Sequence, residues 1–288
     1  MLREGKTVAG IITINQSAAA RADVPGWVDL NTRFGKDIPV YEAHSYRLND
    51  PADQEAIGSF TADVGFCIGW QRLLPSWFLG RLRTGVFGMH CCQFALPRGR
   101  GRSPINWGLI DGAETLQAHI FRYNDAPDAG DLLSITQIPI SVYDNVHTVQ
   151  QKARVVFTRE IIRHWDVLNA GVPELFAGQL TEPDLDYPKR TPDDGAIDWR
   201  WPVTRIVDWV RAQTRPYPGA FCTYRSEHYH VWRCQPFGLP PERPLLPGVV
   251  GESFADSTLA IQAGDGWIHL IDHDLPSTIT IGDRLLCQ

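Results

Sequence analysis

Residues 85–112 read GVFGMHCCQFALPRGRGRSPINWGLIDG, and residues 125–131 read DAPDAGD. The first stretch begins as a short apolar strand ending at His90, passes into a turn rich in Gly, Arg and Pro, and continues as a short helix. The second is an acidic loop between two apolar runs. Open α/β sheets bind ligands beyond the carboxyl ends of their parallel strands. This order of segments is therefore typical of a reaction site on an α/β sheet.

Apolar runs rich in β-branched residues predict strands at 8–14, 39–44, 64–70, 86–90, 117–123 and 132–140. Helix-compatible stretches separate them, and residues 148–168 have apolar positions at helical spacing. This alternation predicts a doubly wound, mostly parallel sheet with helices on both faces. A helix end leads directly into the first strand, so we expect the natural chain or its relatives to begin about 20 residues earlier, with one more strand.

The composition changes after Gly171, where prolines punctuate a polar stretch that reaches Pro202. Beyond it, a short amphipathic helix at 203–214 precedes short alternating runs, which predict a small antiparallel barrel. We expect a catalytic α/β domain at 1–187 that lacks its first strand, a linker at 188–202 and a small OB-like β-barrel at 203–288.

Chain length, net charge and cysteine content narrow the class of protein. The 288 residues carry a net charge of −6, and basic residues cluster only at 98–102, which argues against DNA or tRNA as the main partner. No signal peptide and no bilayer-spanning apolar run are recognisable. The six cysteines contain no C-x-x-C pair. We expect a reduced, cytoplasmic, soluble protein without a membrane or metal partner.

His90 is the first candidate for chemistry, because an imidazole at a strand end can exchange protons near neutral pH. Asp128, in the acidic loop, could orient it and stabilise its charged form. The alternative is a partly buried histidine with a purely structural role. Cys91 and Cys92 lack a flanking base and further ligands, so packing is the favoured role.

Together these motifs resemble the signature of the tetrahydrofolate-dependent formyltransferases, which include methionyl-tRNA formyltransferase and the sugar N-formyltransferases. The motif GWQRLLP at 69–75 is similar to the folate-binding loop of that family. KRTPDDGAIDW at 189–199 and RPYPGAF at 215–221 are similar to its linker and carboxyl-terminal domain. The resemblance covers nearly the whole chain, with the motifs in the family's order.

The resemblance implies formyl transfer from N10-formyltetrahydrofolate to a primary amine, with His90 and Asp128 as the catalytic pair. The residues implied in folate binding are Trp70, Arg72, Leu73, Leu74, Pro75, Asp125, Ala126 and Asp128. Substrate contacts are expected from Arg98, Arg100, Arg102, Asn106 and Arg190. The arginine turn could hold a phosphate through guanidinium groups and backbone N–H donors, or it could be a solvated turn.

Two departures from the family pattern affect the predicted site. Gly88 occupies the position of a family asparagine, and the segment from His90 to Pro97 is two residues longer than usual. Loss of one donor to a developing oxyanion costs roughly 10²–10³ in rate. Gln93 in the longer segment is the candidate replacement donor. The alternative is a folate-binding protein with a disabled site.

The amine substrate is suggested by residues 15–30, NQSAAARADVPGWVDL. The tRNA-acting branch carries a long basic insertion at this place, whereas this stretch is short and has one Arg and two Asp. We therefore expect a small-molecule amine, in particular a nucleotide-linked amino sugar, with methionyl-tRNA as the alternative. A homodimer is possible.

Overall fold

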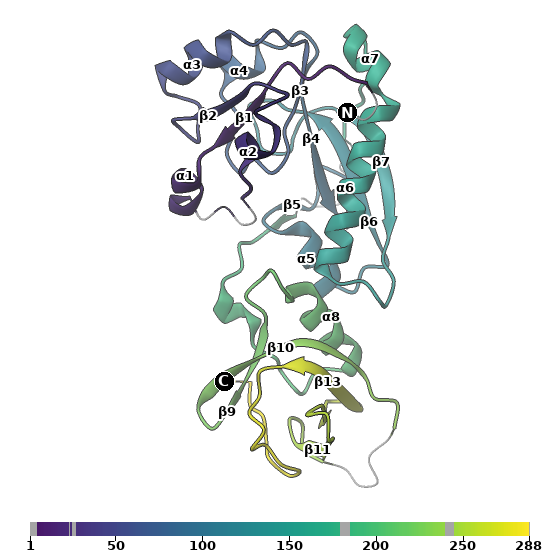
Figure 1. Ribbon diagram of the computed structural model, residues 1–288. Coiled ribbons are helices and arrows are strands. Elements are labelled where there is room, and N and C mark those ends of the chain that lie inside the picture. The colour runs from purple at the N-terminus through teal and green to yellow at the C-terminus, as the bar shows by residue number, and fades with distance from the viewer. Residues whose placement is uncertain (1–4, 23, 25–26, 179–184, 240–244, 288) are drawn as a thin grey trace. The chain divides into compact units, whose positions relative to one another are not determined.

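The computed structural model describes residues 5–22, 24, 27–178, 185–239 and 245–287 (Figure 1). The chain forms two compact units. Unit 1 comprises Met1–His90, His119–Ile135 and Phe157–Gln179, and unit 2 comprises Cys91–Ala118, Thr136–Val156 and Leu180–Gln288. This division groups 91–118 and 136–156 with the carboxyl-terminal residues, whereas the predicted catalytic domain ran without interruption to 187.

The first two predicted strands form a small parallel sheet of their own. β1 (Ile11–Ile14) pairs with β2 (Val40–Ala43), so that Ile11 lies opposite Val40. Between them lie α1 (Gln16–Arg21) and α2 (Leu30–Phe34), which begin after side-chain caps from Asn15 and Asp29. After β2 comes α3 (Pro51–Gly58), which has proline in its first turn and Asp50 as its cap.

Four further strands form a mixed sheet in the order β3 (Val64–Phe66), β4 (Gly85–Cys92), β6 (Thr115–Arg122), β7 (Leu132–Pro139). β3 and β4 are parallel. The N–H of Arg122 donates to Asp131 O, and that of Ile140 donates to Glu114 O. These bonds, at opposite ends of β6 and β7, show an antiparallel hairpin. The short helices α4 (Ser76–Leu79) and α5 (Pro104–Ile110) flank β4 in the chain.

The long helix predicted at 148–168 is interrupted. α6 (Val146–Arg163) is followed by α7 (Trp165–Ala170), with His164 as the N-cap position of the second helix. Within unit 1, the end of α6 contributes Phe157 and Ile161 to a cluster that also contains Phe87, Ile120 and Leu133 from three strands. This cluster buries one face of the sheet at the part that carries His90.

In unit 2, short elements precede the predicted barrel. β5 (Arg100–Gly101) pairs with β8 (Asp186–Tyr187), and they are followed by the 3₁₀ helix η2 (Pro192–Gly195) and by α8 (Val203–Gln213). The final sheet is antiparallel, in the order β11 (Val250–Ser253), β12 (Leu259–Gln262), β13 (Trp267–His273), β10 (Glu227–Pro236), β9 (Ala220–Tyr224).

This antiparallel sheet curls into a half-barrel. Register shifts in the β10–β13 and β11–β12 pairs increase the local twist. Isolated bridges join Thr223 of β9 to Leu286, and Val249, next to β11, to Arg284. Residues 284–286 thus pair at both edges of the sheet.

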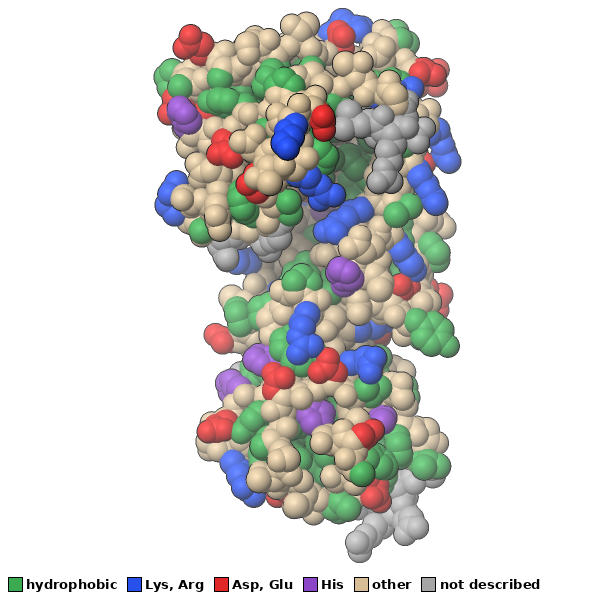
Figure 2. All heavy atoms as spheres, in the orientation of Figure 1, with side chains coloured by type: hydrophobic (Ala, Val, Ile, Leu, Met, Phe, Trp, Pro, Cys, Tyr) green, Lys and Arg blue, Asp and Glu red, His purple; other side chains and the backbone are tan. Residues whose placement is uncertain are grey.

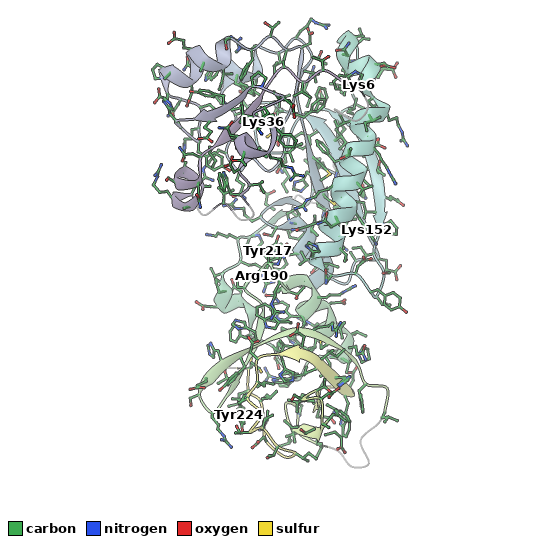
Figure 3. All side chains as sticks on the ribbon, viewed as in Figure 1. Lys6, Lys36, Lys152, Arg190, Tyr217 and Tyr224 are labelled. Carbon is green, nitrogen blue, oxygen red and sulfur yellow. The ribbon has the colours of Figure 1, made fainter. Side chains whose placement is uncertain are left out.

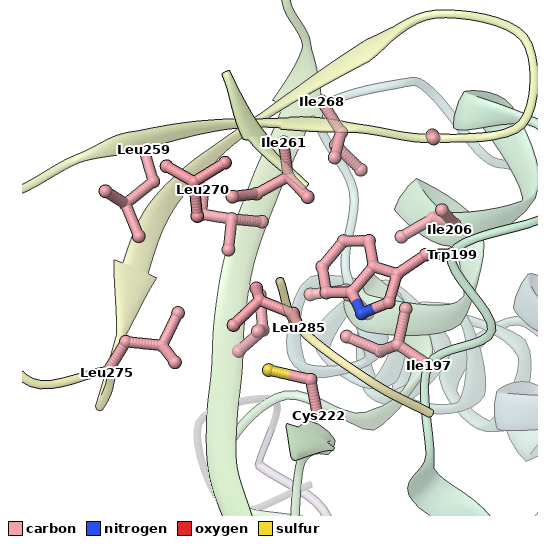
Figure 4. Close-up of a cluster of buried hydrophobic side chains, with 14 of the residues drawn as sticks. Ile197, Trp199, Ile206, Cys222, Leu259, Ile261, Ile268, Leu270, Leu275 and Leu285 are labelled. Carbon is pink, nitrogen blue, oxygen red and sulfur yellow. The ribbon is translucent and has the colours of Figure 1, made fainter. Parts of the chain in front are cut away.

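The core of the half-barrel is a cluster of buried apolar side chains, which Figure 4 shows at close range. Val203, Ile206 and Val210 of α8 pack against this core, at spacings of three and four residues along the helix. Ile206 is completely buried, and full burial of such a side chain contributes about 1.5–3 kcal/mol. Among the described residues, no helix combines the length and apolarity needed to cross a bilayer.

Candidate active site

His90 lies on β4, which ends at Cys92, two residues beyond the predicted end of this strand. The residue is 7% exposed, and its carbonyl oxygen lies 3.3 Å from Nδ1 of the buried His119 on β6. Because side chains alternate along a strand, Gly88 and His90 lie on the same face of the sheet. The sheet therefore fixes the imidazole in a largely enclosed position.

Asp128 approaches His90 from the loop between β6 and β7. Its Oδ2 lies 3.4 Å from His90 Nδ1, and its side chain is 29% exposed. Asp128 has a φ of 46°, a left-handed backbone that non-glycine residues seldom adopt and that clusters at functional sites. A carboxylate beside Nδ1 favours the tautomer with the proton on that nitrogen and leaves Nε2 to exchange protons.

The loop that carries Asp128 is held by its own polar contacts. Asn124 accepts from Ala126 N through Oδ1 and donates to Ala129 O through Nδ2. Ser76, at the start of α4, donates to Asp125 Oδ1 at 2.9 Å. These bonds tie the acidic loop to the end of the 69–75 segment, so that two predicted folate-binding segments are linked within unit 1.

Tyr123, the first residue after β6, occupies the space beside Gly88. A Cβ added at Gly88 would lie 2.6 Å from Tyr123 Oη and 2.7 Å from its Cζ. The Tyr123 N–H donates to Val86 O, and interaction with the neighbouring Cys67 contributes to raising the pKa of the Tyr123 hydroxyl. Burial raises the pKa of Tyr123 far above its ordinary value and that of Cys67 to about 11, so both groups are neutral at pH 7. The sequence analysis did not identify Tyr123.

The 69–75 segment is anchored by Tyr46. The Tyr46 hydroxyl accepts from Gln71 N at 2.9 Å, the Trp70 ring packs edge-on at 4.8 Å, and the Arg72 guanidinium lies 4.9 Å from the Tyr46 ring centre. Leu74 packs beside Trp70 against buried residues of β2 and α3. Leu73 is 57% exposed, and Pro75 is the N-cap residue of α4. The segment thus presents a fixed backbone and one exposed apolar side chain.

A hollow of about 400 Å³ lies beside this segment in unit 1. It is lined by Ala18, Arg21, Ala22, His44, Ser45, Tyr46, Arg47 and Arg72. The Asp53 carboxylate, fully buried, accepts from His44 N, Ser45 N and the Tyr41 hydroxyl, and so fixes one wall. The three lining arginines give the hollow a positive character.

Gln93 and the arginine turn lie in unit 2. Gln93 lines a hollow of about 520 Å³, together with Phe94, Gly112, Ala113, Glu114, Thr115, Gln117 and Gln137. Its Oε1 is buried and has no hydrogen-bond partner among the described residues. Arg98 stacks on Phe94 at 4.2 Å, and Arg100 Nε lies 3.3 Å from Asp186. Arg102 is exposed.

Asn106 and Arg190 both make internal contacts in unit 2. Asn106 on α5 is 4% exposed and donates to Ala212 O on α8 at 2.7 Å. Arg190 donates to Asp194 O and to Gln213 Oε1, and its guanidinium lies 4.4 Å from the Trp209 ring centre (Figure 3). Burial lowers the pKa of Arg190 from its ordinary value. Both side chains therefore hold the elements around them in place.

Cys91, His228 and His230 were the other residues considered for nucleophilic or metal chemistry. Burial raises the pKa of Cys91 to about 12, which keeps its thiol protonated. In the described ranges, no three His, Cys, Asp or Glu side chains gather as a metal site would require. His228 stacks on Phe221 and His230 on Trp232.

On the face drawn in Figure 2, acidic and basic side chains are interspersed.

Solved structures with the same fold include three kinds of protein. HypX from Aquifex aeolicus in complex with tetrahydrofolic acid matches with a TM-score of 0.60 and 15% identity, over 91% of this chain and 43% of that one. The N-formyltransferase from Helicobacter canadensis, in complex with folinic acid and dTDP-3-aminofucose, gives 0.60 and 10% over 93% and 100%. Methionyl-tRNA formyltransferase from Clostridium thermocellum gives 0.55 and 15% over 78% and 91%. The chain spans less than half of the HypX chains that it matches.

The family models cover most of the chain. The formyl transferase model matches residues 5–163, and the model of the formyl transferase carboxyl-terminal domain matches residues 189–281. The first match contains β1 to α6 with His90 and Asp128, and the second contains α8 and the half-barrel. The chain belongs to the formyl transferase family.

Proposed function

We propose that the protein transfers the formyl group of N10-formyltetrahydrofolate to a primary amine of a small molecule, in particular a nucleotide-linked amino sugar. The observation that carries the proposal is the His90–Asp128 pair, 3.4 Å apart and positioned by β4 and the acidic loop. Two solved structures with the same fold, one with tetrahydrofolic acid and one with folinic acid bound, support the co-substrate. For contact with the folate ring we propose the 69–75 segment, with Trp70, Arg72, Leu73, Leu74 and Pro75, and also Asp125 and Ala126 in the loop linked to it.

The folate supplies a formyl group on an aniline-like nitrogen, which is a better leaving group than an ordinary amide nitrogen. His90 Nε2 would stay within reach of the attacking amine and accept its proton, while Nδ1 stays bonded to Asp128. The Asp128 carboxylate stabilises the resulting imidazolium. The 7% exposure of His90 limits the water that can compete with the amine. Negative charge on the formyl oxygen requires a hydrogen-bond donor, for which the sequence offers Gln93.

Two observations support a nucleotide-linked amino sugar as the amine substrate. The relative from Helicobacter canadensis was solved with dTDP-3-aminofucose. Residues 15–30 of this chain lack the basic character expected for binding a tRNA acceptor stem. Arg98, Arg100 and Arg102 are the residues we propose for the phosphates of such a substrate, with Asn106 and Arg190 positioning the elements around them. Methionyl-tRNA remains the second candidate, because a tRNA formyltransferase shares the fold.

The test follows the absorbance change of tetrahydrofolate release while the protein meets N10-formyltetrahydrofolate and a panel of amines. The panel contains dTDP- and UDP-linked amino sugars and methionyl-tRNA. Release with an amino sugar, lost in His90→Ala and kept in the exposed-histidine control His147→Ala, is the expected result. Release with methionyl-tRNA alone would refute the small-molecule substrate. Folate binding without release across the panel would favour a folate-binding protein with a disabled site.

A further inference from the structure

Gly88 and Tyr123 lie in contact, and the Tyr123 ring occupies the space beside residue 88. A Cβ on Gly88 would meet Tyr123 Oη, Cζ and Cε1 at 2.6, 2.7 and 2.8 Å. The φ of Gly88 lies outside the left-handed region, so its backbone does not itself require glycine. The tyrosine ring therefore takes the space that a side chain at residue 88 would need.

The Tyr123 hydroxyl lies where a polar side chain of residue 88 would begin, on the face of β4 that carries His90. The backbone of Tyr123 is fixed by its bond to Val86 O, and its ring lies 5.0 Å from that of Phe121. All of these residues, and Asp128, belong to unit 1. The neighbouring strands β4 and β6 thus place the hydroxyl on the side of β4 that carries His90.

The surroundings of Tyr123 suit a donor that keeps its proton. Its neighbour Cys67, which contributes to raising the pKa of Tyr123, offers only a thiol sulfur, and sulfur is a weak hydrogen-bond acceptor. Burial, Cys67 and the Asp128 carboxylate all raise the pKa of Tyr123, because each disfavours a phenolate. A neutral phenol at a largely enclosed position can stabilise a developing oxyanion without giving up its proton.

We propose that Tyr123 donates a hydrogen bond to the formyl oxygen and so replaces the side chain that residue 88 lacks. The inference rests on the proposed function. As the amine nitrogen bonds to the formyl carbon, the carbonyl π pair moves to oxygen, and this charge accepts the Tyr123 O–H. When the pair returns, the bond from carbon to the folate nitrogen breaks and that nitrogen takes the proton carried by His90. Tyr123 begins and ends the cycle protonated.

Gln93 and Tyr123 compete for this role and predict different results. Gln93 belongs to unit 2 and lines the hollow there, whereas Tyr123 shares unit 1 with His90 and Gly88. If Tyr123 is the donor, Tyr123→Phe lowers kcat by roughly 10²-fold and changes KM for the folate little. Gln93→Ala should then lower kcat by less than Tyr123→Phe does. The reverse pattern would overturn the proposal.

The experiment measures kcat and KM for formyl transfer and, separately, formate release when water replaces the amine. The variants are Tyr123→Phe, Gln93→Ala, Tyr123→Ala and Gly88→Asn/Tyr123→Ala. Tyr143→Phe is the matched control, because Tyr143 is 91% exposed. Removing the ring opens the space beside residue 88, so the double variant should recover at least tenfold in kcat over Tyr123→Ala. Circular dichroism and thermal unfolding confirm that each variant is folded.

The outcomes separate the two proposals. An active wild-type protein with unchanged kcat in Tyr123→Phe would overturn the role of Tyr123 and leave the proposed function standing. Equal losses in Tyr123→Phe and Tyr143→Phe, or no gain from the added asparagine, would also overturn it. A wild-type protein that releases neither formylated amine nor formate would overturn the proposed function, and this inference with it.

Discussion

Gly88→Ala tests the packing of Tyr123 without any enzyme assay. Its Cβ would lie 2.6–2.8 Å from three atoms of the Tyr123 side chain, well inside the usual contact distance of about 3.5–4.0 Å. Overpacking of this kind costs about 1–3 kcal/mol. In a Tyr123→Ala background the space is open, and alanine should instead stabilise a strand by about 0.5–1 kcal/mol over glycine. The free energies of unfolding should therefore show a coupling of about 1.5–4 kcal/mol.

The assay is urea denaturation of the wild type, both single variants and the double variant, followed by circular dichroism. The transition compared is the one that Tyr123→Ala shifts, because the chain has two compact units. Gly58→Ala, on α3, is the control, since only Arg81 Nη1 lies within 4 Å of its added Cβ, at 3.8 Å. Its effect should be the same with and without Tyr123. A coupling for Gly88→Ala below about 0.5 kcal/mol would refute the packing described for this pair.

Three further predictions concern stability and reactivity. Burial opposes ionisation of Asp144, but hydrogen bonds led by Lys152 lower its pKa to about 2 from 3.8, which corresponds to about 2 kcal/mol. Asp144→Asn should thus be about 2 kcal/mol less stable than wild type at pH 7, with the difference vanishing as pH falls from 4 to 2; a constant difference in urea titrations would contradict this. Ile206→Ala should cost about 2–5 kcal/mol in thermal or urea unfolding, because it opens a cavity under α8; a cost below about 1 kcal/mol would show that the site collapses. Cys91, buried and with a pKa raised to about 12, should resist iodoacetamide at pH 8 in the native protein, and labelling within minutes, seen by mass spectrometry, would argue against that burial.

Local patterns predicted the strands and the long helix well, because apolar runs and helical spacing reflect the faces that each element buries. The antiparallel β6–β7 hairpin could have been predicted from the length of the loop between the two strands. Residues 123–131 join the two strands, and a parallel crossover needs a dozen residues or more. The interruption at His164 was not readable, because apolar positions continue at helical spacing on both sides of it. The end of α6 depends on local contacts, such as the one between His164 Nδ1 and Glu160 O at 2.9 Å.

Part of the candidate site was predictable and part was not. The resemblance identified His90 and Asp128, and the structure brings them to 3.4 Å. Their proximity depends on β4 lying beside β6, which no local pattern encodes. Tyr123 was missed because its significance appears only when residue 88 lacks a side chain and the two lie in contact. Asn106 and Arg190 were predicted as substrate contacts from motif matches; the structure shows internal partners for both residues, and their contact with a substrate stays a prediction.

The pairing of residues 284–286 with both edges of the half-barrel has a consequence for biosynthesis. Thr223 and Leu286 lie about sixty residues apart, so this closure is a late, non-local event. At ribosomal speeds of about 5–20 residues per second, Thr223 of β9 waits several seconds for its partner Leu286. Free strand edges attract other chains during such intervals. The half-barrel is therefore most exposed to aggregation while residues 284–286 are not yet paired, and a chaperone that covers this part of β9 would act in that interval.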